Sequence, residues 1–436
     1  LERPPADPEL TPPHIMQDYA NFIGGNWVPA ASGATFTTTN PADTRETVAR
    51  YPLSDGPEFA AATAAAQKAF PAWAAQTPVA RGRFLSKASQ ILEARKADLA
   101  QLLVREEGKT LTEATGEVQR AADIFRFFGG LSYTVGGQTI PHDLPGNLLL
   151  TRREPLGGRA FGAEIASNPA IQALSFTGSH GVGTSLYQTL APRRIRVQLE
   201  MGSKNPTLVL ADADLDLAAR LVAIAGFGLT GQACTATSRV IVERSVLEPF
   251  TEKLVALAKT WKVGSGLQPG VQMGPAVNAD EFEGNFAAIQ QAIGEGAELI
   301  WGGGRLNEGD LAHGHFMQPA ILGKVTPSMR IAQEEVFGPV VAILAVESFD
   351  EAIAVANGVK YGLSASLVTR DFKKAMQYAE RIECGVVKVN QISTGLALQA
   401  PFGGVKDSST DSFREQGTAA LDFYSRTKTV YFDYSA

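Results

Sequence analysis

Several features are scarce or missing in this chain of 436 residues, and each absence narrows what the protein can be. It has only two cysteines, far apart, so we expect no disulfide framework and a reducing compartment. No apolar run approaches the length of a membrane span, and no signal-peptide pattern opens the chain. The formal net charge of −6 argues against a nucleic-acid or anionic-membrane partner. We therefore expect a cytoplasmic globular protein.

The length of the chain is more than one simple core requires, so at least two domains are expected. Residues 1–14, LERPPADPELTPPH, are proline-rich and acidic, and we interpret them as a loose extension or a tag remnant. His313 and His315 could suggest a metal pair, but no third ligand lies nearby in the sequence. A loop is therefore expected there, and no metal site.

The most informative stretch is VAIAGFGLTGQACTATSR, residues 222–239. Small and apolar residues lead through Gly228 and Gly231 to Cys234, which could be reached from a cleft. A thiol is a nucleophile only as thiolate, and a helix N-terminus or a nearby cation usually lowers its pKa. Most cysteines are buried as small apolar side chains, so Cys234 alone does not establish a site.

A second stretch, IRVQLEMGSKNP at 195–206, strengthens that interpretation. Its alternation of apolar and polar residues predicts a strand that ends at Glu200. In open α/β sheets, ligands and chemistry lie at the carboxyl ends of strands. Although most such glutamates are solvated strand ends, Glu200 and Cys234 together suggest a general base and a nucleophile at one centre.

Five segments in order resemble the aldehyde dehydrogenase superfamily: FTGS (176–179), QLEMGSKNP, FGLTGQACTATSR, EEVFGP (334–339) and PFGGVK (401–406). The resemblance runs from about Tyr19 to the C-terminus. It implies an α/β fold with a Rossmann-type cofactor domain, an α/β catalytic domain and a β oligomerisation arm.

The same resemblance suggests where the domains begin and end. It places an extension at 1–18, the cofactor domain at 19–131 and 158–201 with a helix at 410–425, the arm at 132–157 and 426–436, and the catalytic domain at 202–409. Both segments of the arm read as edge strands, which must be paired or become an aggregation liability. A homodimer or homotetramer is therefore expected.

Periodicity and turn residues predict the helices and strands near the N-terminus. We expect a strand, turn and strand at 22–28, and helices at 58–73, 80–107 and 111–128. The pair Gly129-Gly130 is predicted to end the last of these helices.

A nicotinamide cofactor, NAD or NADP, is implied by the resemblance. Gly178 and Gly183 frame a helix start, where backbone N–H groups favour a pyrophosphate. The family places Ser179 beside the diphosphate and nicotinamide ribose, Glu335 on the ribose hydroxyls and Phe337 on the nicotinamide ring. A carboxylate suits a diol because it accepts from both hydroxyls. The residues that discriminate NAD from NADP have no counterpart in this sequence.

The resemblance also implies oxidation of an aldehyde to a carboxylate. The Cys234 thiolate would attack the carbonyl carbon, and Glu200 would activate the water that hydrolyses the resulting thioester. Asn390 and Phe402 fall where the family lines its substrate tunnel. Segments such as GQACTATSRVIV are similar to the branch that acts on α-ketoglutarate semialdehyde (2,5-dioxopentanoate).

Two local features depart from the expected pattern or stand apart from it. Ser203 replaces a usual glycine, so its Cβ is expected to crowd the surroundings of the base. Cys384 opens a strand expected to be buried, and we expect its thiol to be inert.

A gap in the family pattern falls at Gly157-Gly158, where about sixty residues, the size of two βα units, are missing. In the family this stretch supplies an oxyanion-hole asparagine and a lysine for the adenosine ribose. The stretch is absent either from the polypeptide or only from this sequence. Two alternatives therefore stay open, namely a non-catalytic paralogue with a structural role and an esterase-like thiol enzyme.

Overall fold

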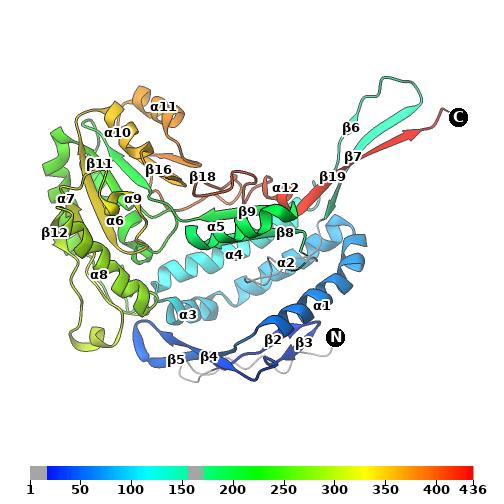
Figure 1. Ribbon diagram of the computed structural model, residues 1–436, viewed down its shortest axis with the longest axis horizontal. Helices are drawn as coiled ribbons and strands as arrows, with labels where there is room; N and C mark the ends of the chain where they lie inside the picture. Colours follow the sequence, from blue (N-terminus) through cyan, green and yellow to red (C-terminus); the bar gives the residue numbers. More distant parts are fainter. Residues whose placement is uncertain (1–16, 156–167, 169–170, 436) are drawn as a thin grey trace.

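The computed structural model describes residues 17–155, 168 and 171–435. Most of the predicted extension at 1–18 and the Gly157-Gly158 junction lie outside them. Figure 1 shows the large sheet and the helices around it at the left. An N-terminal group of helices and strands lies below, and a long β arm projects at the upper right.

The N-terminal region contains the predicted hairpin, β2 (Asn21–Ile23) and β3 (Asn26–Val28). Gly24 and Gly25 form its turn with φ of 59° and 91°, a conformation that glycine adopts without steric cost. A small sheet follows, with the strand order β1-β5-β4. Its strands are β1 (Gln17–Asp18), β4 (Thr35–Asn40) and β5 (Asp43–Pro52).

Four helices follow: α1 (Gly56–Ala75), α2 (Pro78–Ala94), α3 (Lys96–Glu107) and α4 (Leu111–Leu131). The single helix predicted at 80–107 is therefore two, which break at Arg95. The helix stop predicted at Gly129-Gly130 is also wrong. A Cβ at Gly129 would lie 2.6 Å from Ser86 Oγ, and one at Gly82 would lie 2.7 Å from the Gly129 oxygen. These glycines let α2 and α4 pack closely, so tertiary packing decides their role.

Two parallel strands, β8 (Ala173–Gly178) and β9 (Arg196–Met201), flank α5 (His180–Leu190). The register places Thr177 opposite Glu200 and Gly178 opposite Met201. The strand predicted at 195–200 is therefore confirmed, and Glu200 lies at its carboxyl end. Among the described residues this sheet has two strands.

The large sheet has seven strands in the order β12-β13-β14-β11-β10-β16-β17, all parallel except β12. They are β10 (Pro206–Val209), β11 (Arg239–Glu243), β12 (Glu298–Gly302), β13 (Ala320–Gly323), β14 (Val340–Val346), β16 (Ser364–Val368) and β17 (Val386–Val389). Their apolar runs fit strands that are covered on both faces.

Helices cover both faces of this sheet (Figure 1). On β11, Val240 and Val242 pack with α6 (Leu215–Phe227) and α7 (Leu247–Lys259). Ile241, which points to the opposite face, packs with α10 (Phe349–Asn357) and α11 (Phe372–Arg381). The remaining part of that face is covered by α8 (Ala279–Gly294).

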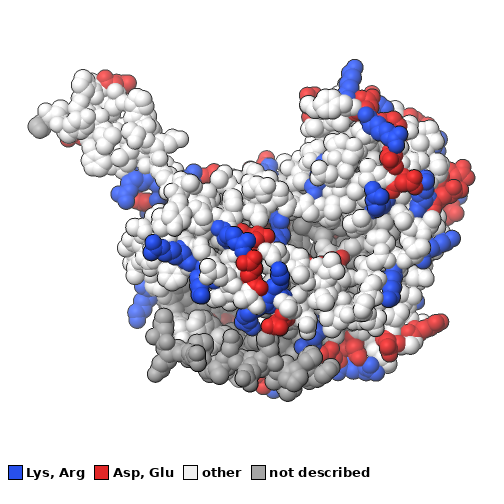
Figure 2. Space-filling model, turned by 180° about the vertical axis from the view of Figure 1, so that it is seen from behind, with Lys and Arg blue, Asp and Glu red and all other residues white. Residues whose placement is uncertain are grey.

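The arm consists of β6 (Thr139–Ile140), β7 (Asn147–Pro155) and β19 (Ser425–Asp433). β7 and β19 pair antiparallel over nine positions, from Asn147↔Asp433 to Pro155↔Ser425. The helix expected at 410–425 is limited to α12 (Ala420–Tyr424). Figure 2 shows that the arm carries few charged side chains, and that both signs are interspersed over the rest of this face.

Cys384 does not open a buried strand as predicted, because β17 is the edge of the seven-stranded sheet and Val387 is exposed there. The thiol is nevertheless largely shielded and donates to Val386 O at 3.2 Å. Burial raises the pKa of Cys384 to about 12. None of the described helices combines the length and apolarity needed to cross a membrane.

Candidate active site

The proposed base and the loop that carries the proposed nucleophile both lie at the junction of the two-stranded and seven-stranded sheets. The chain leaves the carboxyl end of β9 after Glu200 and Met201, and enters the amino end of β10 at Pro206. Pro206 pairs with Arg239 on β11, so the loop that carries Cys234 lies at that same amino edge. The site therefore lies between the carboxyl edge of one sheet and the amino edge of the other.

Asn205, in the short link between the sheets, fixes the cysteine loop. Its Nδ2 donates to Cys234 O at 2.8 Å and to Ala236 O at 3.0 Å, and its Oδ1 accepts from Ser364 N at 3.0 Å. The side chain is 1% exposed. The sequence analysis missed this role, although the polar SKNP segment between two predicted strands was a signal for it.

The backbone of the cysteine loop follows an unusual path. Leu229, Thr230 and Gly231 all have positive φ, of 52°, 56° and 67°. A Cβ at Gly231 would lie 2.1 Å from Gly338 O, so the tight path predicted at this glycine is confirmed. Glu113 of α4 supports the loop by accepting from Leu229 N at 2.7 Å.

Glu200 is buried beside a glycine turn. Its Oε2 accepts from Gly404 N at 3.0 Å, and Ser409 Oγ donates weakly to Oε1 at 3.4 Å. Burial, with a smaller contribution from the Glu415 carboxylate, raises the pKa of Glu200 to about 8, although Arg414 acts in the opposite direction. A general base benefits from a pKa near the working pH.

The surroundings of Cys234 differ from those expected of a reactive thiol. Burial, with smaller contributions from the carboxylates of Glu335, Glu200 and Glu415, raises the pKa of Cys234 to about 11. Glu335 accepts from Ser203 N and Asn205 donates to Cys234 O, and β9, which carries Glu200, leads directly into this 202–205 link. Among the described residues, the charged groups that act on this pKa are carboxylates, and they raise it.

Glu335 lies against the link between the sheets. Its Oε1 accepts from Ser203 N at 3.0 Å, and a Cβ at Gly202 would lie 1.9 Å from its Oε2. Ser203 Oγ accepts from Leu363 N at 3.3 Å, so the hydroxyl has a polar partner of its own. Burial raises the pKa of Glu335, while the ammonium of buried Lys204 partly offsets this shift.

The start of α5 lies at the same carboxyl edge as Glu200. Ser179 is the N-cap, and its Oγ accepts from Val182 N at 3.4 Å. Gly178 and Ser179 are exposed, whereas Gly183 is buried with no room for a Cβ beside Met201 Sδ. Gly183 thus lets α5 pack closely on β9, and the exposed helix start remains accessible.

The two phenylalanines predicted for the site lie in different surroundings. Phe337 is 36% exposed and has φ of 59°, a conformation uncommon outside glycine. Phe402 is buried and exchanges two backbone hydrogen bonds of 2.6 Å with Glu415. Phe402 therefore lies beside the Glu200 turn, and Phe337 has a face open to a ligand.

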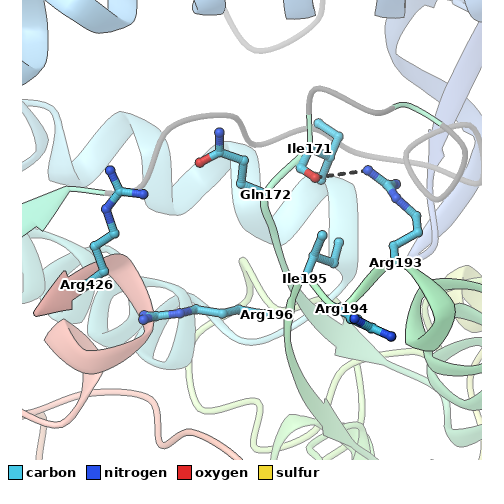
Figure 3. A pocket seen from close by; sticks show the side chains of 7 residues that line it. All are labelled: Ile171, Gln172, Arg193, Arg194, Ile195, Arg196 and Arg426. Carbon is cyan, nitrogen blue, oxygen red and sulfur yellow. Dashed lines mark hydrogen bonds between the residues drawn. The ribbon is translucent and has the colours of Figure 1, made fainter.

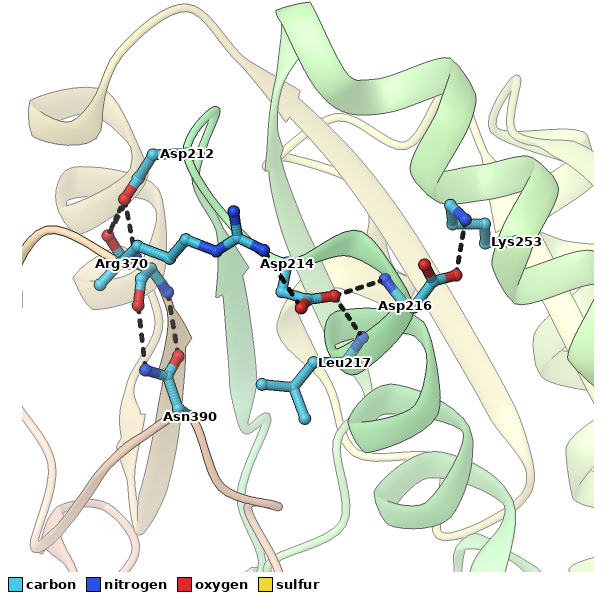
Figure 4. A network of polar contacts seen from close by, with 8 residues as sticks. Asp212, Asp214, Asp216, Leu217, Lys253, Arg370 and Asn390 are labelled. Atoms are coloured by element: carbon cyan, nitrogen blue, oxygen red, sulfur yellow. Dashed lines mark hydrogen bonds and ion pairs between the residues drawn. The ribbon is translucent and has the colours of Figure 1, made fainter.

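Asn390, expected to line a substrate tunnel, lies at the other end of the strands. It follows β17, and its amide donates to Thr369 O at 2.9 Å and accepts from Thr369 N at 3.1 Å. Figure 4 shows Asn390 in a polar network with Asp212 and Arg370. This network joins loops at the carboxyl edge of the seven-stranded sheet, opposite Cys234, so the structure does not bring Asn390 into the cluster.

A cavity of about 550 Å³ lies at the amino ends of β8 and β9, away from Glu200 (Figure 3). It is lined by Ile171, Gln172, Arg193, Arg194, Ile195, Arg196 and Arg426. It is therefore separate from the cysteine site.

A half-buried cysteine and a buried glutamate thus lie at the junction of two sheets in an α/β protein. The chain belongs to the aldehyde dehydrogenase family, whose model matches residues 27–160 and 157–430. The two matches meet at residues 157–160, where the sequence predicted the gap.

Three curated relatives cover 95% of this chain. Alpha-ketoglutarate semialdehyde dehydrogenase of Haloferax volcanii is 40% identical over 479 residues, with 99% of that protein covered. The Bacillus subtilis enzyme described as alpha-ketoglutaric semialdehyde dehydrogenase is 37% identical over 477 residues, with 98% covered. 2,5-Dioxopentanoate dehydrogenase of Saccharolobus solfataricus is 34% identical over 482 residues, with 99% covered. Each alignment is longer than the 436-residue chain, as expected if the relatives contain a segment that it lacks.

Solved structures support the same fold. An NAD-dependent aldehyde dehydrogenase from Sinorhizobium meliloti has a TM-score of 0.92 at 29% identity, covering 99% of this chain and 97% of that one. Betaine aldehyde dehydrogenase from Staphylococcus aureus, in complex with NAD+, has a TM-score of 0.91 at 26% identity, covering 96% and 95%. The predicted fold class is therefore confirmed, and the chain is an aldehyde dehydrogenase.

Proposed function

We propose that the chain oxidises a semialdehyde to the corresponding dicarboxylate through Cys234, with Glu200 as general base. The observation that carries the proposal is that Glu200 and the Cys234 loop both lie at the junction of the two sheets, where Gly404 N donates to the Glu200 carboxylate and Asn205 donates to Cys234 O. The semialdehyde is supported by the names of the three curated relatives, two of which act on alpha-ketoglutarate semialdehyde and one on 2,5-dioxopentanoate.

In this mechanism the Cys234 sulfur attacks the aldehyde carbon, and the Cys234 backbone N–H stabilises the resulting oxyanion. Asn205 cannot be the second donor, because its Nδ2 is bound to two carbonyls. When bound, an oxidised nicotinamide dinucleotide supplies positive charge and the hydride acceptor that converts the adduct to a thioester. Glu200, once deprotonated, takes a proton from the water that hydrolyses this thioester.

The described residues fit one half of NAD or NADP. Glu335 can accept hydrogen bonds from ribose hydroxyls, and its contact with Gly202 leaves no space for a side chain there. Ser179 and Gly178 at the exposed start of α5 would hold the diphosphate, and Phe337 would pack on the nicotinamide. The counterpart of the adenosine site falls in the gap at residues 157–160.

An assay of NAD and NADP reduction with a panel of semialdehydes tests the function. Cys234→Ala should abolish reduction of the cofactor. Glu200→Gln should slow hydrolysis and leave a covalent acyl adduct, visible as added mass on the Cys234 peptide. Full turnover by either variant would contradict the assignment.

A second candidate is a dehydrogenase fold with impaired cofactor binding and residual esterase-like activity. The interrupted family match at 157–160 favours it. Intact mass spectrometry of the source protein tests the premise, because a mass near 46.3 kDa means that the segment is absent from the polypeptide. For such a protein, calorimetry should show loss of NAD binding, while hydrolysis of an activated ester that depends on Cys234 should persist.

We also propose the domain boundaries, from the placement of the sheets, and a homo-oligomer, from the exposed side chains of the arm. Residues 202–409 carry the seven-stranded sheet, and 19–131 with 158–201 carry the α5 site. On the arm, Tyr431 and Phe432 are 65% and 51% exposed, which favours pairing with a second copy. Light scattering of the purified protein distinguishes a monomer from a homodimer or homotetramer.

A further inference from the structure

Arg120 is a cation without a carboxylate partner in the part of the chain that the structure describes. It projects from α4 and is half-buried. Its guanidinium donates to Leu396 O and, at 2.9 Å, to Gln416 Oε1, both neutral acceptors. A guanidinium has five N–H donors, so several remain for a further ligand.

Lys388 on β17 approaches the same loop. Its half-buried ammonium donates to Thr394 O and Gly395 O, which again are neutral acceptors. Burial lowers the pKa of Lys388 to about 8. Two cations from distant elements therefore hold three consecutive carbonyls, those of residues 394, 395 and 396.

This loop is attached to the catalytic cysteine. Ser393 Oγ donates to Thr235 O at 2.7 Å, and Thr235 follows Cys234 directly. Residues 394–396 lie within three residues of that anchor, a reach of at most about 10 Å. The two cations thus flank a loop that begins beside the reacting sulfur, whereas the thiol itself is surrounded by Glu200, Glu335 and Glu415.

An anionic aldehyde entering beside three carboxylates needs a compensating positive charge. We propose that Arg120 and Lys388 bind the carboxylate at the far end of the substrate, so that the enzyme selects aldehydes that carry a remote carboxylate. This assignment rests on the proposed function and names the side chains that would give it its substrate class. Arginine suits such a role because its planar donors match a carboxylate.

A purely structural role is the alternative, in which both cations only hold the loop. The two roles differ in what they discriminate. A structural cation affects every ligand of the site alike, whereas a carboxylate anchor affects only ligands with the remote charge.

The test measures protection of Cys234 from alkylation by iodoacetamide, followed by peptide mass mapping. Glutarate, a five-carbon dicarboxylate, is compared with pentanoate, which has the same length and only one carboxylate. In the unmodified protein glutarate should protect at lower concentration than pentanoate. In Arg120→Gln and Lys388→Gln the glutarate concentration that gives half-maximal protection should rise about 10- to 100-fold, the range expected for a lost charge-assisted hydrogen bond. The pentanoate concentration that gives half-maximal protection should change less than about threefold.

Arg126→Gln is the matched control, because Arg126 lies on the same helix and is paired with Glu93 and Asp123. It should leave both ligands unaffected. Arg120→Lys keeps the positive charge and should recover part of the glutarate preference. Equal protection by the two ligands, no protection by glutarate, or equal weakening of both in the variants would overturn the proposal. The assay needs no turnover, so failure of cofactor reduction would contradict the proposed function alone.

Discussion

The Gly404 N–H donates to Glu200 Oε2 at 3.0 Å, across 204 positions of sequence. The preceding residue, Gly403, approaches the same carboxylate so closely that an added Cβ would lie 2.6 Å from Oε1. The PFGG segment therefore serves as the wall of the base's pocket. The orientation of Glu200 depends on a turn from the far end of the chain as well as on its own strand.

Gly403→Ala tests this wall. The added methyl group should displace the Glu200 carboxylate and lower kcat about 10-fold or more, because a misplaced base loses its alignment with water. The steady-state rate of cofactor reduction is the measurement. Gly116→Ala is the control, since Gly116 is an exposed residue of α4 with nothing within 4 Å of its added Cβ. That change should stabilise the protein by about 0.5–1 kcal/mol and leave kcat unchanged.

The raised pKa of Glu200 predicts a dependence of stability on pH. Its folded pKa is about 8, and an unfolded glutamate has a pKa of about 4.3. Between these values the folded state holds the proton that the unfolded state has lost, so stability falls as the pH rises through this window. Glu200→Gln should flatten the decline of Tm between about pH 5 and 8.

The decline should be reduced without disappearing, because burial also raises the pKa of Glu335 and Glu415. Glu334→Gln is the control, because the pKa of Glu334 is shifted downward whereas that of Glu200 is shifted upward. Its hydrogen bond with Lys360 lowers the pKa of Glu334, so its contribution is lost only as the pH falls. The slope of Tm between pH 5 and 8 should remain in that variant. A Glu200→Gln protein with the unaltered slope would contradict the expectation.

The reactivity of Cys234 should be low in the free protein at neutral pH. Its pKa of about 11 predicts an alkylation rate by iodoacetamide that rises with pH up to that value. Glu335→Gln removes the carboxylate that contributes most among the neighbouring charges, so the rate at pH 8 should increase. Mass mapping of the two cysteine peptides follows the reaction, with Cys384 as an internal reference because its own pKa is about 12. An unchanged rate in the variant would show that Glu335 does not act on the thiol.

Asn205 and Asn390 provide a comparison between the two edges of the seven-stranded sheet. Asn205→Ala removes the partners of three backbone groups and should cost roughly 3 kcal/mol of stability. It should also disorder the cysteine loop and abolish most of the turnover. Asn390→Ala should lower Tm as well, because it frees both polar groups of Thr369, but should leave Cys234 alkylation unchanged. Equal effects of both changes on Cys234 would argue that Asn390 also acts on the site.

The sequence was informative where chemistry and local pattern coincide. The strand that ends at Glu200 and the constrained path at Gly231 follow from alternation and from small residues, and the structure has both. Asn205, the Gly403–Gly404 wall and the cations at 120 and 388 could not be found in this way. Asn205 binds Cys234 O 29 positions away, Gly404 binds Glu200 204 positions away and Arg120 binds Gln416 296 positions away, so only the fold brings these partners together.

The errors share a physical cause as well. A glycine pair was taken as a helix stop at 129–130, whereas the close crossing of α2 and α4 requires glycine there. The charges that act on the Cys234 thiol could not be found from the sequence either. The charges around Cys234 come from three separate elements, and their sign cannot be read from its own loop.

The link of residues 202–205 is short, and every one of its side chains or backbone groups is buried. A connection this short and this buried holds the two sheets in a fixed arrangement and does not act as a hinge. The separation between the reacting sulfur and its base is then set when the chain folds, because a link without slack keeps the two sheets at one distance.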